Sequence, residues 1–269
     1  MRTGQKTNLS KNDLDAQLSE LSQGVFKAFE NAQDLFQEAA LLRAHGALSR
    51  ALFLHQISLE ECGKIEILGA AAVSLLAGHD TDLKRVTSVV TKHKAKNYAN
   101  AYFLRLTGEE KAAKESGDWE RVLRAFKQQQ ANFHLQSNTM KNASLYVDFT
   151  DGRFTAPKET VTDEMVKELA AVNREFLALA EPKVRMVARW LTDTDEVRKM
   201  VQWFVERAEE LKSHPDMDPR QAMSVLMSEM LVRAKSSSYQ NVAQDTDNPS
   251  GRRLETRGSR VRKNIRKGK

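Results

Sequence analysis

The sequence predicts an all-α protein, a helical bundle with one short extended segment. Apolar residues recur at the three- and four-residue spacing of a helix face through much of the chain. Only five prolines among 269 residues, with 41% hydrophobic residues, suit a mostly helical globular body. The stretch from Ser49 to Leu68 is apolar on nearly every side of a helical wheel, which indicates a central helix packed all round.

The elements before this central stretch follow from spacing and caps. Apolar residues predict a helix over residues 12–30, and Asn31 is a candidate N-cap for a second helix that ends near His45. Gly46 marks the turn, because glycine commonly follows the end of a helix. The central helix then runs from about 47 to 76.

The next elements are separated by glycines. A turn at Gly78 precedes a helix with an apolar row over residues 83–104, for which Asp80 or Thr81 is the candidate N-cap. A polar connection flanked by two glycines is expected at 108–117. Aromatic and aliphatic residues then predict another long helix over 119–140, the last before the extended segment.

The extended segment lies near 145–157, where Leu-Tyr-Val-Asp-Phe alternates and an Asp-Gly pair follows, so it is extended or a short hairpin. Thr162 is a candidate N-cap for a helix to residue 191, which Pro182 is expected to kink or break. Two further helices are expected at 194–211 and 221–233.

These elements predict three parts: a helical domain over 12–191, a helical extension over 192–235, and a polar tail over 236–269 that we expect to be disordered. The tail has nine Lys or Arg against three acids, which leaves 42 − 9 = 33 bases and 36 − 3 = 33 acids elsewhere. The whole basic bias therefore belongs to the tail. Its cations fit phosphate contacts with RNA or the ribosome, or a solvated tail that aids solubility; the cations are Arg252, Arg253, Arg257, Arg260, Arg262, Lys263, Arg266, Lys267 and Lys269.

The cellular location follows from the lone cysteine and the apolar runs. A single cysteine, Cys62, excludes an internal disulfide framework and fits a reducing compartment. No secretory signal opens the sequence, and the longest apolar run, 65–76, is too short to span a bilayer. We therefore expect a cytoplasmic protein without a membrane segment.

Charged residues interrupt the central helix at one place. Glu60, Glu61 and Lys64 lie between apolar turns, where a carboxylate must be paired or lose its hydration at a high cost. Lys64 follows Glu60 by four residues and Glu61 by three, so it can reach either. Gly63 costs a helix interior about 1 kcal/mol relative to alanine, and its missing side chain allows a neighbouring backbone to approach.

A second polar run, His93-Lys94-Ala95-Lys96, is expected on the next helix, with His93 on its inward row. Together the two runs form the candidate site, which comprises Glu60, Glu61, Lys64, His93, Lys94 and Lys96. In one interpretation His93 transfers protons while Lys64 and Lys96 hold a phosphate. In the other, these residues form a buried ion-pair network that fixes how two helices pack. The spacing does not favour a metal, and we expect no cofactor.

Several of these stretches resemble the AbiV family of bacterial abortive infection proteins, which is grouped with the HEPN-type helical domains. The resemblance covers roughly 25–190 and rests on residues Asn31-Ala32, Arg50-Ala51, Glu60-Glu61-Cys62-Gly63-Lys64, His93-Lys94-Ala95-Lys96, Lys141-Asn142 and Leu145-Tyr146-Val147-Asp148-Phe149. It implies a HEPN-like bundle that defends against phage by arresting growth or macromolecular synthesis in the infected cell. The partners that fit are a phage protein as trigger, and a second copy of the chain in a homodimer.

Many HEPN proteins are metal-independent ribonuclease toxins that use an Arg and a His separated by four to six intervening residues. The matching pairs here are Arg50 with His55, early in the central helix, and Arg207 with His214, in the extension. His55 stands alone among apolar residues, which favours a structural role. The alternatives to the polar-cluster hypothesis are therefore such a ribonuclease, and a non-catalytic helical module that binds a phage or host protein.

Overall fold

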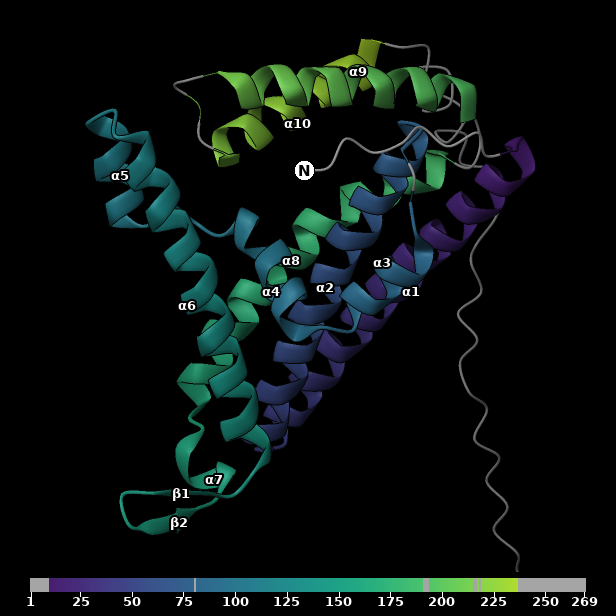
Figure 1. The fold of residues 1–269 in the computed structure, drawn as a ribbon. Helices are drawn as coiled ribbons and strands as arrows, with labels where there is room; N and C mark the ends of the chain where they lie inside the picture. The colour runs from purple at the N-terminus through teal and green to yellow at the C-terminus, as the bar shows by residue number, and fades with distance from the viewer. Residues whose placement is uncertain (1–9, 80, 191–193, 215–216, 218, 237–269) are drawn as a thin grey trace, which may run out of the picture. The chain divides into compact units, whose positions relative to one another are not determined.

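The computed structural model describes residues 10–79, 81–190, 194–214, 217 and 219–236. The described elements confirm the all-α prediction, since helices dominate and the two described strands form one small sheet (Figure 1). The helices are α1 (Lys11–Ala44), α2 (Leu48–Leu76), α3 (Leu83–Val90), α4 (His93–Asn100), α5 (Gly108–Glu115), α6 (Trp119–Leu145), α7 (Pro157–Thr160), α8 (Asp163–Trp190), α9 (Thr194–Ser213) and α10 (Pro219–Ser236).

The central helix is α2, as predicted. α1 runs alongside it, while α4, α6 and α8 pack on its other sides (Figure 1). Two apolar clusters share α2: Leu75 packs with α1, α8 and α9, and Leu59 packs with α1 and α8. Burying an aliphatic side chain contributes about 1.5–3 kcal/mol to the stability of the fold. No side chain caps the N-terminus of α2, so this helix is stabilised mainly by packing.

Two predicted helix boundaries in the first half are wrong. Asn31 does not begin a helix, because α1 continues through it and keeps Ala28 and Ala32 buried. Packing against α2 therefore outweighs the capping preference of Asn31. The N-cap before α3 is Asp82, whose carboxylate accepts from the backbone of Lys84 and Arg85.

The predicted helix over 83–104 is two helices, α3 and α4, separated at Thr91 and Lys92. Val89, Val90 and Thr91 form a β-branched run with low helix propensity, which favours a break there. The break makes His93 the first residue of α4. The polar connection at 108–117 contains a helix of its own, α5, which begins with a capping box between Thr107 and Glu110.

The hairpin prediction is confirmed by β1 (Asp148–Thr150) and β2 (Arg153–Thr155), which pair antiparallel. Asp151 and Gly152 both have positive φ, 54° and 78°, the backbone of a two-residue hairpin turn. Thr162 accepts from the backbone of Met165, as expected for an N-cap. Pro182 does not end its helix, since α8 continues to Trp190.

The chain forms two compact units, residues 1–226 and 227–269, with the boundary inside α10. All of the helical packing considered below belongs to the first unit. None of the helices among the described residues is long and apolar enough to cross a membrane. The predicted domain boundaries stay a prediction, and the tail from residue 237 onward lies outside the described residues.

Candidate functional site

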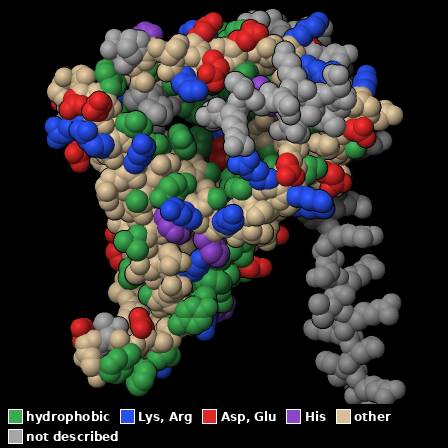
Figure 2. Space-filling view, in the orientation of Figure 1, with side chains coloured by type: hydrophobic (Ala, Val, Ile, Leu, Met, Phe, Trp, Pro, Cys, Tyr) green, Lys and Arg blue, Asp and Glu red, His purple; other side chains and the backbone are tan. Residues whose placement is uncertain are grey.

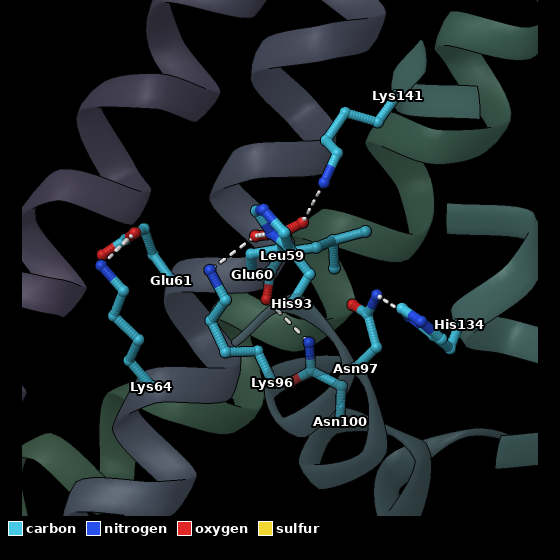
Figure 3. A network of polar contacts seen from close by, with 10 residues as sticks. All are labelled: Leu59, Glu60, Glu61, Lys64, His93, Lys96, Asn97, Asn100, His134 and Lys141. Carbon is cyan, nitrogen blue, oxygen red and sulfur yellow. Dashed lines mark hydrogen bonds and ion pairs between the residues drawn. The ribbon is translucent and has the colours of Figure 1, made fainter. Parts of the chain in front are cut away.

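Glu60 is the centre of a buried polar cluster on α2. Its side chain is 2% exposed, and two lysines and a histidine from two other helices contact its carboxylate (Figure 3). Oε2 lies 2.5 Å from Nδ1 of His93 and 2.6 Å from Nζ of Lys96, both on α4. Oε1 accepts from Nζ of Lys141 on α6, 3.2 Å away. We call Glu60, His93, Lys96 and Lys141 the Glu60 cluster.

The approach of α4 to α2 is made possible by Gly63. A Cβ at this position would lie 2.5 Å from the carbonyl oxygen of Lys96, closer than real side chains allow. The expected close approach of a neighbouring backbone at Gly63 is therefore confirmed. Asn100, at the end of α4, fixes the same contact by donating from Nδ2 to the carbonyl of Leu59 at 2.7 Å.

The charge of Glu60 is set by two opposing effects. Burial disfavours the carboxylate, but the hydrogen bonds from Lys96 and His93 and the charges of Lys96 and Lys141 together outweigh burial. The pKa of Glu60 therefore lies below its ordinary value, so the group is ionised at neutral pH. Two lysines thus face one carboxylate, and the cluster has a net positive charge before His93 is protonated.

His93 joins the cluster to the surface. Its side chain is 52% exposed, whereas those of Lys96 and Lys141 are 7% and 10% exposed. Because Nδ1 is engaged by Glu60, Nε2 is the ring nitrogen that can exchange a proton with a ligand. Histidine side chains are visible on this face beside Lys and Arg (Figure 2). A carboxylate that holds an imidazole by Nδ1 orients it for general acid/base chemistry.

A second layer of amides and imidazole lies next to the cluster. Asn97, one turn after His93 on α4, contacts Nδ1 of His134 on α6 through Nδ2 at 3.2 Å (Figure 3). Asn97 and Asn100 are buried, with 1% and 0% exposure, and the Oδ1 atom of each lacks a hydrogen-bond partner among the described residues. His134, Asn97 and Asn100 are not among the site residues predicted from the sequence.

The structure divides the predicted site residues. Glu60, His93 and Lys96 are brought together, but Lys64 does not reach Glu60. Lys64 instead pairs with Glu61 at 2.6 Å, on the side of α2 that faces α1 and α3, where both line a groove of about 560 Å³. Lys64 therefore cannot hold a phosphate together with Lys96 in the Glu60 cluster. Lys94 is exposed, with its Nζ 5.2 Å from the ring centre of Tyr98.

Lys141 replaces Lys64 as a partner of Glu60. It lies on α6 in a buried row with two small residues, Ser137 and Ser144. Helical periodicity does not detect this row because none of its members is apolar. The pattern that could have revealed it is a lysine between small residues at spacings of four and three, which marks a close helix contact rather than a solvated face.

The Arg50/His55 pair has a geometry that favours the structural role expected for His55. Arg50 is exposed, while His55 is 1% exposed and packs edge-on against Phe36 with ring centres 5.0 Å apart. Asn173 lies 3.3 Å from Nδ1 of His55. Burial lowers the pKa of His55 to about 4, with smaller effects from Arg43 and Arg174, so the ring is neutral at pH 7.

The second pair, Arg207 and His214, lies at the end of α9. Arg207 donates to Glu210 three residues later at 2.8 Å, and His214 follows the last helical residue, Ser213. The tail cations that were predicted to contact nucleic acid lie outside the described residues. Among the residues that the structure describes, no three His, Cys, Asp or Glu side chains gather to hold a metal ion.

Comparison with known proteins adds the family to this geometry. An uncharacterized protein, y4gJ, from Sinorhizobium fredii is 41% identical over 107 residues, which are 40% of this chain and 56% of that protein. The chain thus spans about half the length of this curated relative. No solved structure matches the chain. A family model, HEPN_AbiV, matches residues 20–178 and so includes every member of the Glu60 cluster. The protein belongs to the AbiV family of HEPN-like helical proteins.

Proposed function

We propose that this protein acts in bacterial defence against phage by abortive infection, and that the Glu60 cluster is the part on which this activity depends. Family membership supports the first half of the proposal, since AbiV is a family of abortive infection proteins. The second half rests on one observation, the buried carboxylate of Glu60 with His93, Lys96 and Lys141 around it. The expected consequence in the infected cell is an arrest of growth or macromolecular synthesis.

Burying the charges of the Glu60 cluster is energetically costly. Moving an ion out of water costs several kcal/mol, and a buried ion pair often stabilises a protein no more than apolar residues of similar volume would. A network of one carboxylate and two buried lysines is therefore a poor choice for stability alone. A site that binds an anion, or that transfers a proton through His93, gives a reason for retaining these charges.

The test is a phage challenge of bacteria that express the wild-type protein, Lys96→Met or Lys141→Met. Lys64→Met is the matched control, because Lys64 also pairs with a buried glutamate on α2 but lies outside the cluster. We expect both cluster variants to lose protection and the control to keep it, with expression and melting temperature measured for each. Full protection by both cluster variants would refute the proposed role of the cluster.

A second candidate, a metal-independent ribonuclease, is supported by the Glu60–His93 contact. A half-exposed imidazole, oriented by a buried carboxylate and flanked by lysines, combines a proton-transfer group with charges that can stabilise a phosphorane-like transition state. Purified protein incubated with total RNA, with and without EDTA, tests this candidate. Cleavage that survives EDTA and disappears in His93→Asn would support it, and intact RNA under both conditions would exclude it.

A third candidate, a non-catalytic module that binds a phage or host protein, is supported by the hairpin. Four large apolar side chains there are 61–75% exposed, which is unusual for a solvated surface: Tyr146, Val147, Phe149 and Phe154. Hydrophobic side chains are visible at this end of the molecule (Figure 2). Substituting serine for Phe149 and Phe154 should leave the helical body folded, because both are exposed. Unchanged protection by this double variant would exclude the hairpin as a binding surface.

A further inference from the structure

α6 packs against α4, and this packing places His134 of α6 close to the part of α4 that carries His93. The two helices run antiparallel here, since residues of increasing number on α6 meet residues of decreasing number on α4. Gln130 donates to the carbonyl of Tyr98, His134 meets Asn97, and Lys141 reaches Glu60 beside His93. His134 therefore contacts α4 one helical turn after His93, with Asn97 between the two imidazoles (Figure 3).

The environments of the two imidazoles differ. A carboxylate holds His93, whereas an amide holds His134 and positive charges surround it. Partial burial lowers the pKa of His134, and the neighbouring cations lower it further, so its protonated form donates a proton more readily than an ordinary imidazolium. The negative charge of Glu60 instead raises the pKa of His134. The charged groups that influence His134 are Lys94 and His93 from α4, Lys141 from α6 and Glu60 from α2.

Asn97 can support His134 in both of its protonation states. In the structure, the amide nitrogen of Asn97 donates to Nδ1, which places the proton of a neutral ring on Nε2. Once the ring is protonated, Nδ1 carries a hydrogen and needs an acceptor. The Oδ1 atom of Asn97 is such an acceptor, buried and without a partner among the described residues. Rotating the amide by half a turn would therefore preserve the hydrogen bond.

We propose that His134 is the general acid that acts opposite His93 on a phosphodiester with a neighbouring hydroxyl, and that Asn97 is its positioning residue. This inference rests on the ribonuclease candidate above. Nε2 of His93 removes the proton of the ribose 2′-hydroxyl, and the 2′-oxygen forms a bond to phosphorus. The bond from phosphorus to the 5′-oxygen breaks as Nε2–H of His134 protonates that oxygen. The products are a 2′,3′-cyclic phosphate and a free 5′-hydroxyl, and Lys96 and Lys141 supply positive charge to the phosphoryl oxygens.

The nature of the nucleophile follows from the cluster itself. No member of the Glu60 cluster carries a hydroxyl or a thiol, so the attacking oxygen comes from outside the protein, and in the proposed step it is the hydroxyl of the substrate itself. RNA carries this hydroxyl at its 2′ position, and DNA does not. The site consequently distinguishes RNA from DNA by chemistry, without any base contact. A DNA strand can bind to it but has no hydroxyl for His93 to activate.

Changing the leaving group tests the acid directly. A 5′-alkoxide needs a proton to leave, whereas 4-nitrophenolate leaves without one. We would compare His134→Gln with the wild type on ribodinucleoside monophosphates and on nucleoside 3′-(4-nitrophenyl phosphates). General acid catalysis contributes about 10²–10⁴-fold. The variant should therefore cleave dinucleotides roughly 100-fold more slowly or worse and keep nearly wild-type activity on the nitrophenyl esters. His45→Gln, an exposed histidine that ends α1, is the control and should match the wild type on both substrates.

The pH profile gives a second readout that a purely structural role would not change. The acid must be protonated, so dinucleotide cleavage should fall as pH rises above the lowered pKa of His134. Nitrophenyl ester cleavage should lack this alkaline decline. An equal loss on both substrates in His134→Gln would overturn the acid role and leave the ribonuclease candidate standing. If the wild type cleaved neither substrate, the acid role of His134 and the ribonuclease candidate would both be overturned.

Discussion

Gly63 offers a way to disturb the Glu60 cluster without changing any of its charges. In Gly63→Ala, the new methyl group would lie 2.5 Å from the carbonyl oxygen of Lys96 and 2.9 Å from its carbonyl carbon and Cα. These are backbone atoms, so no side-chain rotation relieves the clash and α4 has to move away from α2. The displacement carries the Lys96 ammonium away from Glu60, although every charged residue is still present.

The change in the free energy of unfolding of Gly63→Ala follows from two opposing effects. Overpacking a tight contact costs about 1–3 kcal/mol, and a backbone neighbour places this site toward the upper end. Alanine regains about 1 kcal/mol of helix propensity relative to glycine. The net loss of stability is therefore about 1–2 kcal/mol, which lowers the melting temperature by roughly 2–8 °C for a domain of this size.

Gly69 provides the matched control on the same helix, because nothing lies within 4 Å of a Cβ built there. Gly69→Ala should raise stability by about 1 kcal/mol through helix propensity alone. Differential scanning calorimetry would compare the two variants with the wild type, and a phage challenge would measure protection. If Gly63→Ala were as stable as Gly69→Ala and fully protective, the close contact between α2 and α4 would be needed neither for stability nor for protection, which would refute the prediction.

Three other outcomes can be measured on the same protein. The free energy of unfolding should decrease as pH falls from 6.5 to 4, because the pKa of His55 is lowered from 6.5 to about 4 in the fold. The stability is fully present above pH 6.5, and the loss on acidification amounts to about 3 kcal/mol. Urea unfolding of His55→Gln should lack this pH dependence. Cys62 should resist a thiol reagent at pH 7 until the protein unfolds, because burial raises its pKa to about 12 and leaves the residue 2% exposed. Truncation after Ser236 should remove the long-range, salt-dependent attraction for a random RNA duplex. For the full-length protein, log affinity should fall with log salt concentration with a slope of about −4 to −5 if about five tail cations contact phosphates, and equal affinity of both forms would refute this role of the tail.

The sequence predicted the site best where a residue type is unfavourable in its local environment. Glu60 and Gly63 both carry a cost inside an apolar helix, and those costs identified the cluster and the close helix contact. Lys141 could not be found this way, because its row on α6 is polar and small and resembles a solvated face. The division between α3 and α4 also escaped periodicity, since Leu83 and Leu104 keep helical spacing across the break. Pairing between helices distant in sequence, such as Glu60 with Lys141, depends on tertiary packing that no local pattern contains.

A second ion pair on α2 provides a comparison for the Glu60 cluster. Glu66 pairs with one lysine, Lys183 of α8, at 2.5 Å, and the ammonium also lies 3.5 Å from the ring centre of Phe103. This pair is balanced, one charge against one, and burial raises the pKa of Glu66.

Glu60 lies less than two helical turns away and is surrounded by more positive charge than it can neutralise. Its pKa is lowered instead of raised. Joining two helices requires only the balanced arrangement that Glu66 already provides. The surplus of positive charge at Glu60 therefore supports the proposal that the cluster binds an anion, and a phosphate group carries the charge and the acceptor oxygens that Lys96, Lys141 and His93 can bind.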